Sequence, residues 1–306
     1  PAHWFYNRDN LKDTFNGGVT QYEDAPHPHP ESFMVGMEYH PDVKKAEELG
    51  RKFDILHENA RFYDTSWSDL EITTGERESE HGNSTPKEED RYHYHHGMKA
   101  GQNTVGAHLV RVLLRSVASE GHYDEDRFLE DFVDFMTTSG NHPDPYTEIY
   151  LRLWFENYSK GLPPHACAER QREVWSIGSN GGLIRPMVVG LLAENPYQAL
   201  GFAAEHQALT HRSENVTSAL TITVPLLHDL ISQADPPGAA CARSAQLRVP
   251  KINGEEMFKM YREHKGPGNI PDREMWKLHI DMEDEPFDLA NLSANFDEDE
   301  VIQKKF

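Results

Sequence analysis

A glycine- and serine-rich run near the middle of the chain has the composition of an anion-binding turn. Residues 175 to 186 read WSIGSNGGLIRP. Glycine permits positive φ angles and leaves the backbone bare, so that several N–H groups can point at one ligand. The apolar run from Leu183 to Leu192 predicts a buried helix behind the turn, and the positive end of a helix dipole favours phosphate. A tight turn before a core helix explains the same pattern, and this alternative stays open.

This run resembles the central signature of the ADP-ribosylglycohydrolase family. Members of that family carry a Ser/Gly-rich segment that ends in an arginine and a proline, followed by a Thr-His pair, which corresponds here to Thr210 and His211. Flanking segments, at residues 1–4, 99–104 and 225–227, extend the likeness over most of residues 1 to 231. The resemblance implies an all-α fold, a multi-helix orthogonal bundle around a ligand cleft. It also implies hydrolysis of glycosidic bonds to ADP-ribose.

The resemblance assigns a set of candidate ligand-binding residues, although it leaves the catalytic residues unknown. In the expected arrangement the turn would cradle ADP-ribose or a related nucleotide-sugar, and the Thr-His pair would shape the pocket. The residues of the turn are Ser176, Ser179, Asn180, Gly181, Gly182 and Arg185, and those of the pair are Thr210 and His211.

The metal site that the resemblance implies is changed in this sequence. Active relatives hold two magnesium ions with the help of a Thr-Asp-Asp-Thr segment at a helix start, where this chain has Gly101, Gln102, Asn103 and Thr104. Mg²⁺ prefers anionic oxygens, whereas Gln and Asn offer only neutral carbonyls. We therefore expect a degraded magnesium site, no metal and no other cofactor. Relatives also carry helices of the metal site before and after the region that this chain shares with them, and we expect these helices to be absent from the 306 residues.

Composition narrows the class of protein further. The chain has 30 Lys and Arg against 51 Asp and Glu, a net charge of −21, which disfavours binding to a nucleic-acid backbone. No apolar run reaches the ~20 residues of a membrane span.

Cys167 and Cys241 are too few for a disulfide framework and favour a reducing compartment, either the cytoplasm or an organelle matrix. A cleaved targeting segment before Pro1 stays open.

Helical periodicity dominates the pattern of apolar residues, and no segment alternates with the period of a strand. We expect a helical core over residues 1–235, with a polar insertion at about residues 64–90, and a helical extension with an acidic tail over residues 236–306. The core helices include residues 105–116, 124–138, 147–160 and a stretch from residue 213 to 231 that contains Pro225. Two shorter helices are expected at residues 254–264 and 272–280.

Histidines occur in two dense groups, for which metal binding is the less favoured interpretation. His27 and His29 alternate with prolines and are expected at the solvated surface. The run from Tyr92 to His96 contains three histidines, but it lacks the acidic residue that a helical zinc motif requires. Both groups are therefore expected to be structural or surface residues.

Two classes of function are compatible with these residues. One is an active, metal-dependent hydrolase that releases ADP-ribose from modified protein. The other is a pseudoenzyme, which binds an ADP-ribose-like small molecule or an ADP-ribosylated protein weakly, or serves as a structural subunit of a larger assembly. A chain that lacks helices which its relatives pack into the core is also expected to expose apolar surface, and so to oligomerise or bind a protein partner. The sequence slightly favours the pseudoenzyme.

Overall fold

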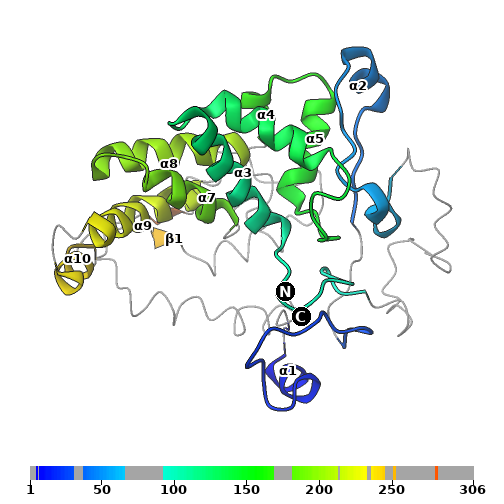
Figure 1. Cartoon of the computed structure of the whole chain (residues 1–306), viewed down its shortest axis with the longest axis horizontal. Coiled ribbons are helices and arrows are strands. Elements are labelled where there is room, and N and C mark those ends of the chain that lie inside the picture. The colour runs from blue at the N-terminus through cyan, green and yellow to red at the C-terminus, as the bar shows by residue number, and fades with distance from the viewer. Residues whose placement is uncertain are drawn as a thin grey trace. The chain divides into compact units, whose positions relative to one another are not determined.

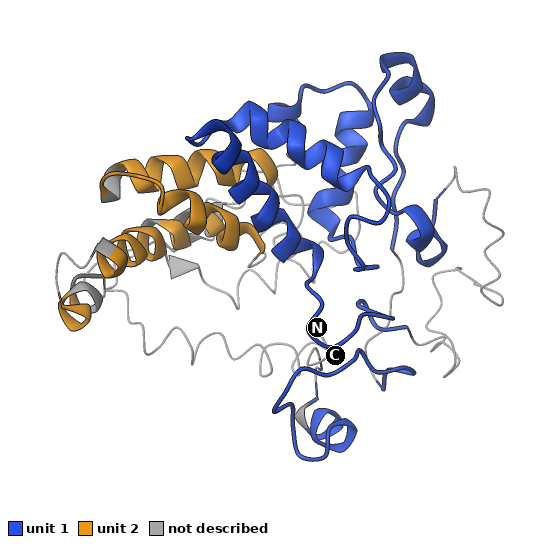
Figure 2. Cartoon of the chain, viewed as in Figure 1, with its two compact units in different colours: residues 1–167, 296–306 blue, residues 168–295 orange. Residues whose placement is uncertain are grey.

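The computed structural model describes residues 5, 7–30, 37–65, 92–168, 181–212, 214–232, 236–244, 251–252 and 280–281 (Figure 1). The fold is all-α, as predicted. The described residues form two compact units, one up to Cys167 and one from Ala168 onward (Figure 2). The expected boundary at residue 235 stays a prediction. The predicted insertion lies outside the described residues apart from Asp64 and Thr65.

The first unit is built from five α-helices and two short 3-10 helices within its described part. The α-helices are α1 (Arg8–Thr14), α2 (Val43–Leu49), α3 (Val105–Glu120), α4 (Glu125–Met136) and α5 (Ile149–Ser159), and the 3-10 helices are η1 (His57–Phe62) and η3 (Pro164–Ala166). Helix α3 packs against α4, and α2 packs against α5.

Helices α3 and α4 follow directly from the local sequence. Residues spaced three and four apart on α3 are buried, as the periodicity predicted; they are Val105, Leu109, Val112, Leu113 and Ser116. Gly121 ends the helix in the left-handed conformation at φ 77°, which glycine adopts without steric cost. The side chain of Asp124 caps α4 by accepting the N–H of Arg127 at 2.8 Å.

An aromatic cluster fills the centre of the first unit. Phe132 of α4 meets Trp154 of α5 edge to face with ring centroids 5.0 Å apart, and it stacks against Phe128 at 6.0 Å. Trp154 in turn stacks on Tyr158, over which the Arg51 guanidinium lies 4.3 Å from the ring centroid. Such ring pairs add about 0.5–1.5 kcal/mol each to the free energy of burial. This cluster therefore joins α4 and α5 and fixes the segment after α2 against them.

The second unit is a helical layer with a tightly packed centre. Helices α7 (Gly181–Gly190), α8 (Pro196–Thr210) and α9 (Glu214–Ser232) pack against one another, and α10 (Pro237–Ser244) packs on α9 (Figure 1). Strands β1 (Lys251–Ile252) and β2 (Ile280–Asp281) form a two-residue antiparallel pair. The buried core consists of Ala199 and Ala203 of α8 and Leu220 and Val224 of α9, and Leu183 and Met187 of α7 pack against it.

Three expectations about local structure are corrected or left untested. His29 is not at the solvated surface but fully buried, because Phe5 and His93 pack on its ring at 4.4 and 4.7 Å. Burial lowers the pKa of His29 to about 4, so the ring is neutral at physiological pH. Ile280 lies in a strand rather than in a helix. The rest of that predicted helix, and the one at residues 254–264, lie outside the described residues.

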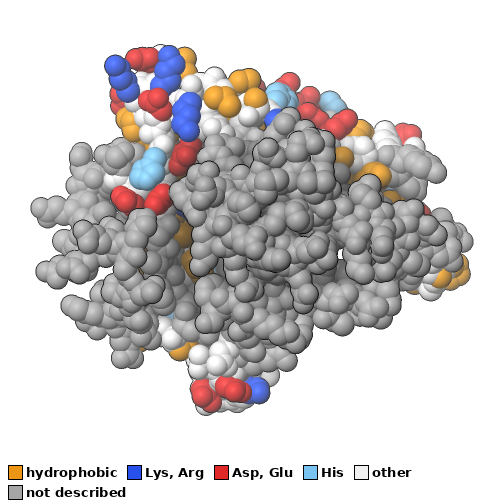
Figure 3. Space-filling model, turned by 180° about the vertical axis from the view of Figure 1, so that it is seen from behind, with side chains coloured by type: hydrophobic (Ala, Val, Ile, Leu, Met, Phe, Trp, Pro, Cys, Tyr) orange, Lys and Arg blue, Asp and Glu red, His pale blue; other side chains and the backbone are white. Residues whose placement is uncertain are grey.

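The described surface mixes both signs of charge. At the upper left of Figure 3, Lys and Arg side chains lie beside Asp and Glu side chains. On α2, for example, Lys45 pairs with Glu48 at 3.2 Å. In the part of the chain that the structure describes, no helix is both long and apolar enough to span a bilayer.

Candidate functional site

The start of α7 and the end of α8 bring three of the predicted site residues together. Arg185 of α7 donates from Nη2 to the hydroxyl of Thr210 at 2.6 Å, and that hydroxyl lies 2.9 Å from Nδ1 of His211. All three side chains are buried, Arg185 with only 2% of its surface exposed. These three residues of the signature therefore form one hydrogen-bonded network, although Arg185 and Thr210 are 25 residues apart along the chain.

The backbone beside this network is held by a further residue, Gln207, which was not among the predicted site residues. Gln207 is buried on α8 and donates from Nε2 to the carbonyl oxygen of His211 at 2.6 Å, while its backbone carbonyl accepts the N–H of His211 at 2.7 Å. These bonds satisfy polar groups where α8 ends, and they fix the direction of the His211 backbone. Gln207 lies one helical turn before His211, a spacing that could have indicated its role.

Gly182 lets α7 approach the Thr-His pair closely. A Cβ atom at this position would lie 3.0 Å from Cδ2 of His211 and 3.1 Å from Cγ1 of Val216. Both distances are shorter than ordinary van der Waals contacts. The glycine at 182 thus has a packing role in addition to the amide-presenting role that the sequence predicted.

The network contains one permanent cation, Arg185, and the neutral imidazole of His211, and a second neutral imidazole belongs to His206 on α8. Burial lowers the pKa of His206 and of His211 well below the usual range, and the Arg185 charge lowers both further. Both rings are therefore neutral at physiological pH, and Arg185 supplies the positive charge near the start of α7. An arginine at the positive end of a helix favours an anionic ligand.

The structure describes the predicted turn only at its helical end. Gly181 is the first residue of α7 and is partly exposed, so its N–H lies at the helix start. Ser176, Ser179 and Asn180 lie outside the described residues. Their part in a phosphate cradle stays a prediction.

The expected metal position lies at the start of α3, in the first unit. Gln102 and Asn103 are exposed, and Thr104 is the N-cap residue of α3, but its side chain does not cap the helix. The Gln102 side-chain oxygen accepts the N–H of Lys99 at 2.7 Å, while the Gln102 N–H donates to the carbonyl of Lys99 at 3.0 Å. Gln102 therefore closes a local turn with the only oxygen that its side chain could offer to a metal ion.

Asp144 takes over the capping of α3, a role that the sequence did not predict. One carboxylate oxygen accepts the N–H of Val105 at 2.9 Å, and the other accepts from Nδ1 of His95 at 2.7 Å and from the N–H of Tyr146 at 3.1 Å. Asp144 is only 1% exposed. An acidic residue between Pro143 and Pro145 could have suggested a capping role for Asp144. The sequence does not show, however, that this segment meets a helix that begins 39 residues earlier.

These residues do not fit a magnesium ion. Mg²⁺ needs several hard oxygens in octahedral geometry, preferably carboxylates. At the start of α3, however, positions 102 and 103 are amides, and the nearby Asp144 carboxylate already accepts three N–H donors. Among the described residues no group of three or more His, Cys, Asp or Glu side chains is arranged to hold a metal. We therefore derive no chemical step through magnesium.

Comparison with known proteins identifies the family. The model of the ADP-ribosylglycohydrolase family matches residues 62–269, more than half of the chain. The protein belongs to the ADP-ribosylglycohydrolase family, as the signature predicted. Searches of curated proteins and of solved structures found no match.

Proposed function

We propose that this chain binds ADP-ribose or a related nucleotide-sugar at the start of α7, and that it is weak or silent as a hydrolase. The ligand would be a free small molecule or an ADP-ribosylated protein. The observation that carries the proposal is the pair Gln102 and Asn103 at the expected metal position, with the side-chain oxygen of Gln102 bonded to the N–H of Lys99. Neutral amides do not offset the cost of dehydrating Mg²⁺.

Support for ligand binding comes from the second unit. Arg185, Thr210 and His211 keep the residue types of the family signature and form one buried network. The network ties α7 to the end of α8, and N–H groups that are already held in place bind phosphate without a large ordering cost. The same intact network is the observation that favours the alternative, an active metal-dependent hydrolase.

A role in a larger assembly is supported by apolar side chains on the surface of the second unit. Ile184, Leu191 and Leu192, on or directly after α7, are 48%, 36% and 41% exposed. Exposed aliphatic groups that gather on one element are typical of protein interfaces. A protein partner or a second copy of the chain would cover them.

Replacing Gly181 with valine is expected to abolish ADP-ribose binding, because the added side chain blocks the approach of the diphosphate to the helix start. Titration calorimetry with ADP-ribose measures this loss. Gly181 is a better choice than Gly182, where a side chain would also clash with His211. Gly201→Val on α8 is the matched control, since a Cβ there meets no atom within 4 Å. Equal affinities for the wild type and for Gly181→Val would place the ligand elsewhere.

Magnesium is expected neither to bind beside Thr104 nor to stimulate release of ADP-ribose from modified protein. The measurement is release of ADP-ribose with magnesium and with a chelator, alongside calorimetry with magnesium alone. The double variant Gln102→Asp, Asn103→Asp restores two carboxylates and is expected to recover little in this chain. Robust hydrolysis by the wild type that is lost on chelation would refute the silent assignment and favour the active hydrolase.

A further inference from the structure

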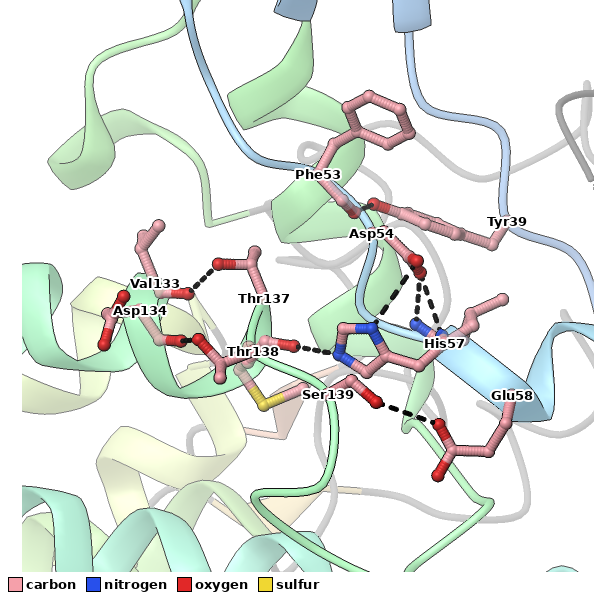
Figure 4. Close-up of polar contacts among 12 residues, drawn as sticks. Tyr39, Phe53, Asp54, His57, Glu58, Val133, Asp134, Thr137, Thr138 and Ser139 are labelled. Carbon is pink, nitrogen blue, oxygen red and sulfur yellow. Dashed lines mark hydrogen bonds and ion pairs between the residues drawn. The ribbon is translucent and has the colours of Figure 1, made fainter.

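The C-terminal end of α4 has a side-chain donor on each of its last four carbonyl groups. Three donors are local and do not titrate near neutral pH. The Thr137 and Thr138 hydroxyls donate to the carbonyls of Val133 and Asp134 at 2.8 and 2.7 Å, and the Asn141 side-chain amide donates to Phe135 at 2.9 Å. The fourth donor is Nε2 of His57, which lies 3.1 Å from the carbonyl oxygen of Met136. The helix end is thus completed by a titratable residue 79 positions away in the sequence (Figure 4).

The His57 ring lies between two acceptors. Nε2 faces the Met136 carbonyl, and Nδ1 lies 3.5 Å from a carboxylate oxygen of Asp54. A neutral imidazole carries only one N–H, so it can donate to one of these groups while it turns a lone pair toward the other. The imidazolium donates to both, and its charge also suits the negative end of the α4 dipole. The geometry therefore selects the protonated ring.

The segment that carries His57 depends on its side chains for its conformation. His57 adopts φ +50°, in the left-handed region that a residue with a side chain adopts only at a cost. The other carboxylate oxygen of Asp54 accepts the N–H groups of Leu56 and His57 at 3.0 and 2.9 Å. Asp54 thus holds both the backbone and the ring of this turn.

The charged groups around the ring, within the described residues, reinforce this arrangement. On its own segment Asp54 and Glu58 both favour the charged ring. Glu58 also accepts the Ser139 hydroxyl at 3.3 Å beyond the end of α4. On α4 the Asp134 carboxylate is paired with Lys52 at 3.3 Å. His142 would oppose a positive charge on His57, but burial lowers the pKa of His142 whereas the pKa of His57 is raised, so His142 loses its proton at a lower pH than His57.

We propose that His57 is a pH-responsive clamp, which holds residues 54–58 against the C-terminal end of α4 while the ring is protonated and releases them as the pH rises. The clamp joins two parts of the first unit through Asp54 on one side and the Met136 carbonyl on the other. The Ser139–Glu58 and Lys52–Asp134 contacts flank it. The clamp lies in the first unit, and the proposed ligand site lies in the second.

The direction of the pH dependence follows from two shifts. The Asp54 side chain raises the pKa of His57 above its usual 6.5, so its contribution to stability is complete below that value and is lost as the pH rises through the raised pKa. Burial of Asp54 would raise its own pKa, but the hydrogen bonds from His57 outweigh this and lower it below 3.8. The contribution of Asp54 to stability is therefore lost only as the pH falls through its lowered pKa. The clamp holds at pH values between the lowered pKa of Asp54 and the raised pKa of His57.

The test follows the unfolding midpoint in denaturant and amide hydrogen exchange from about pH 6 to about pH 9. In the wild type, protection of the Leu56 and His57 amides, corrected for the intrinsic base-catalysed rate, is expected to fall several-fold over this range. His57→Gln still donates to Met136 but does not titrate, so its protection should be pH-independent. Asp54→Asn keeps an oxygen for the two N–H groups but removes the charge, and it should reduce the pH dependence, because only the Met136 carbonyl and Glu58 still favour the protonated ring.

A matched control keeps the experiment specific. His122 also lies after a helix end, with Nδ1 3.1 Å from the carbonyl of Glu120, but its side chain is exposed rather than held between two acceptors. His122→Gln should leave the pH profile of the wild type unchanged. An NMR titration of the His57 ring that gives a midpoint at or below the ordinary histidine value would overturn the proposal. So would equal pH profiles for the wild type and for His57→Gln.

Discussion

Replacing Asp144 with alanine is expected to lower the free energy of unfolding by about 3–5 kcal/mol, because it leaves buried donors without an acceptor. The lost acceptor serves the N–H at the start of α3, the N–H of Tyr146 and the ring of His95. No water replaces it cheaply, since Asp144 and His95 are only 1% and 5% exposed. Denaturant unfolding of the wild type and the variant measures the difference.

Asp24 supplies a matched control for this experiment. Its carboxylate also accepts one backbone N–H, from Ala100 at 2.7 Å, and one charged side chain, Lys99 at 2.9 Å. Its side chain is 53% exposed, however, so water replaces these bonds when they are lost. Asp24→Ala should therefore cost far less than Asp144→Ala. Equal losses for the two variants would mean that burial does not determine the importance of Asp144.

Replacing Gly190 with alanine is expected to lower the free energy of unfolding by about 1–3 kcal/mol, the usual cost of overpacking. A Cβ atom at 190 would lie 2.6 Å from Cγ1 of Val224 on α9 and 3.4 Å from the carbonyl oxygen of Ala199 on α8. Neither neighbour moves easily, because one is a β-branched side chain on a helix and the other is backbone. Thermal or denaturant unfolding measures the loss.

Two further variants separate overpacking from the general effect of replacing a helical glycine. Val224→Ala removes the clashing methyl groups, so the double variant Gly190→Ala, Val224→Ala should lose less stability than the sum of the single losses. Gly201→Ala on α8 has no atom within 4 Å of its new methyl group and should stabilise the protein by about 0.5–1 kcal/mol, because alanine favours the helix. Additive losses at 190 and 224 would show that the two sites do not compete for space.

The local sequence by itself determined core helices such as α3 and α4, and it determined the family. On α3 and α4 the apolar residues recur at helical spacing, and the structure buries these faces because a stripe of this kind must leave water. The Ser/Gly-rich run and the Thr-His pair identified the family, because a family signature is a pattern of residue types at fixed spacings, which the sequence alone contains. The Gln102 and Asn103 positions, too, could be compared with the family from sequence alone.

Only the tertiary structure decided which residues far apart in the sequence pack together or form hydrogen bonds with each other. His29 is buried because Phe5 and His93 pack on it, although its alternation with prolines indicated a solvated loop. Asp144 rather than the Thr104 side chain caps α3, and His57 completes the capping of α4, because the fold brings each of them to a helix end 39 or 79 residues away in the sequence. A helix end leaves backbone groups that need partners, but any polar side chain that the fold brings near can supply one. The sequence predicts, from local spacing, that a helix end needs a hydrogen-bond partner. Which residue is that partner depends on long-range packing.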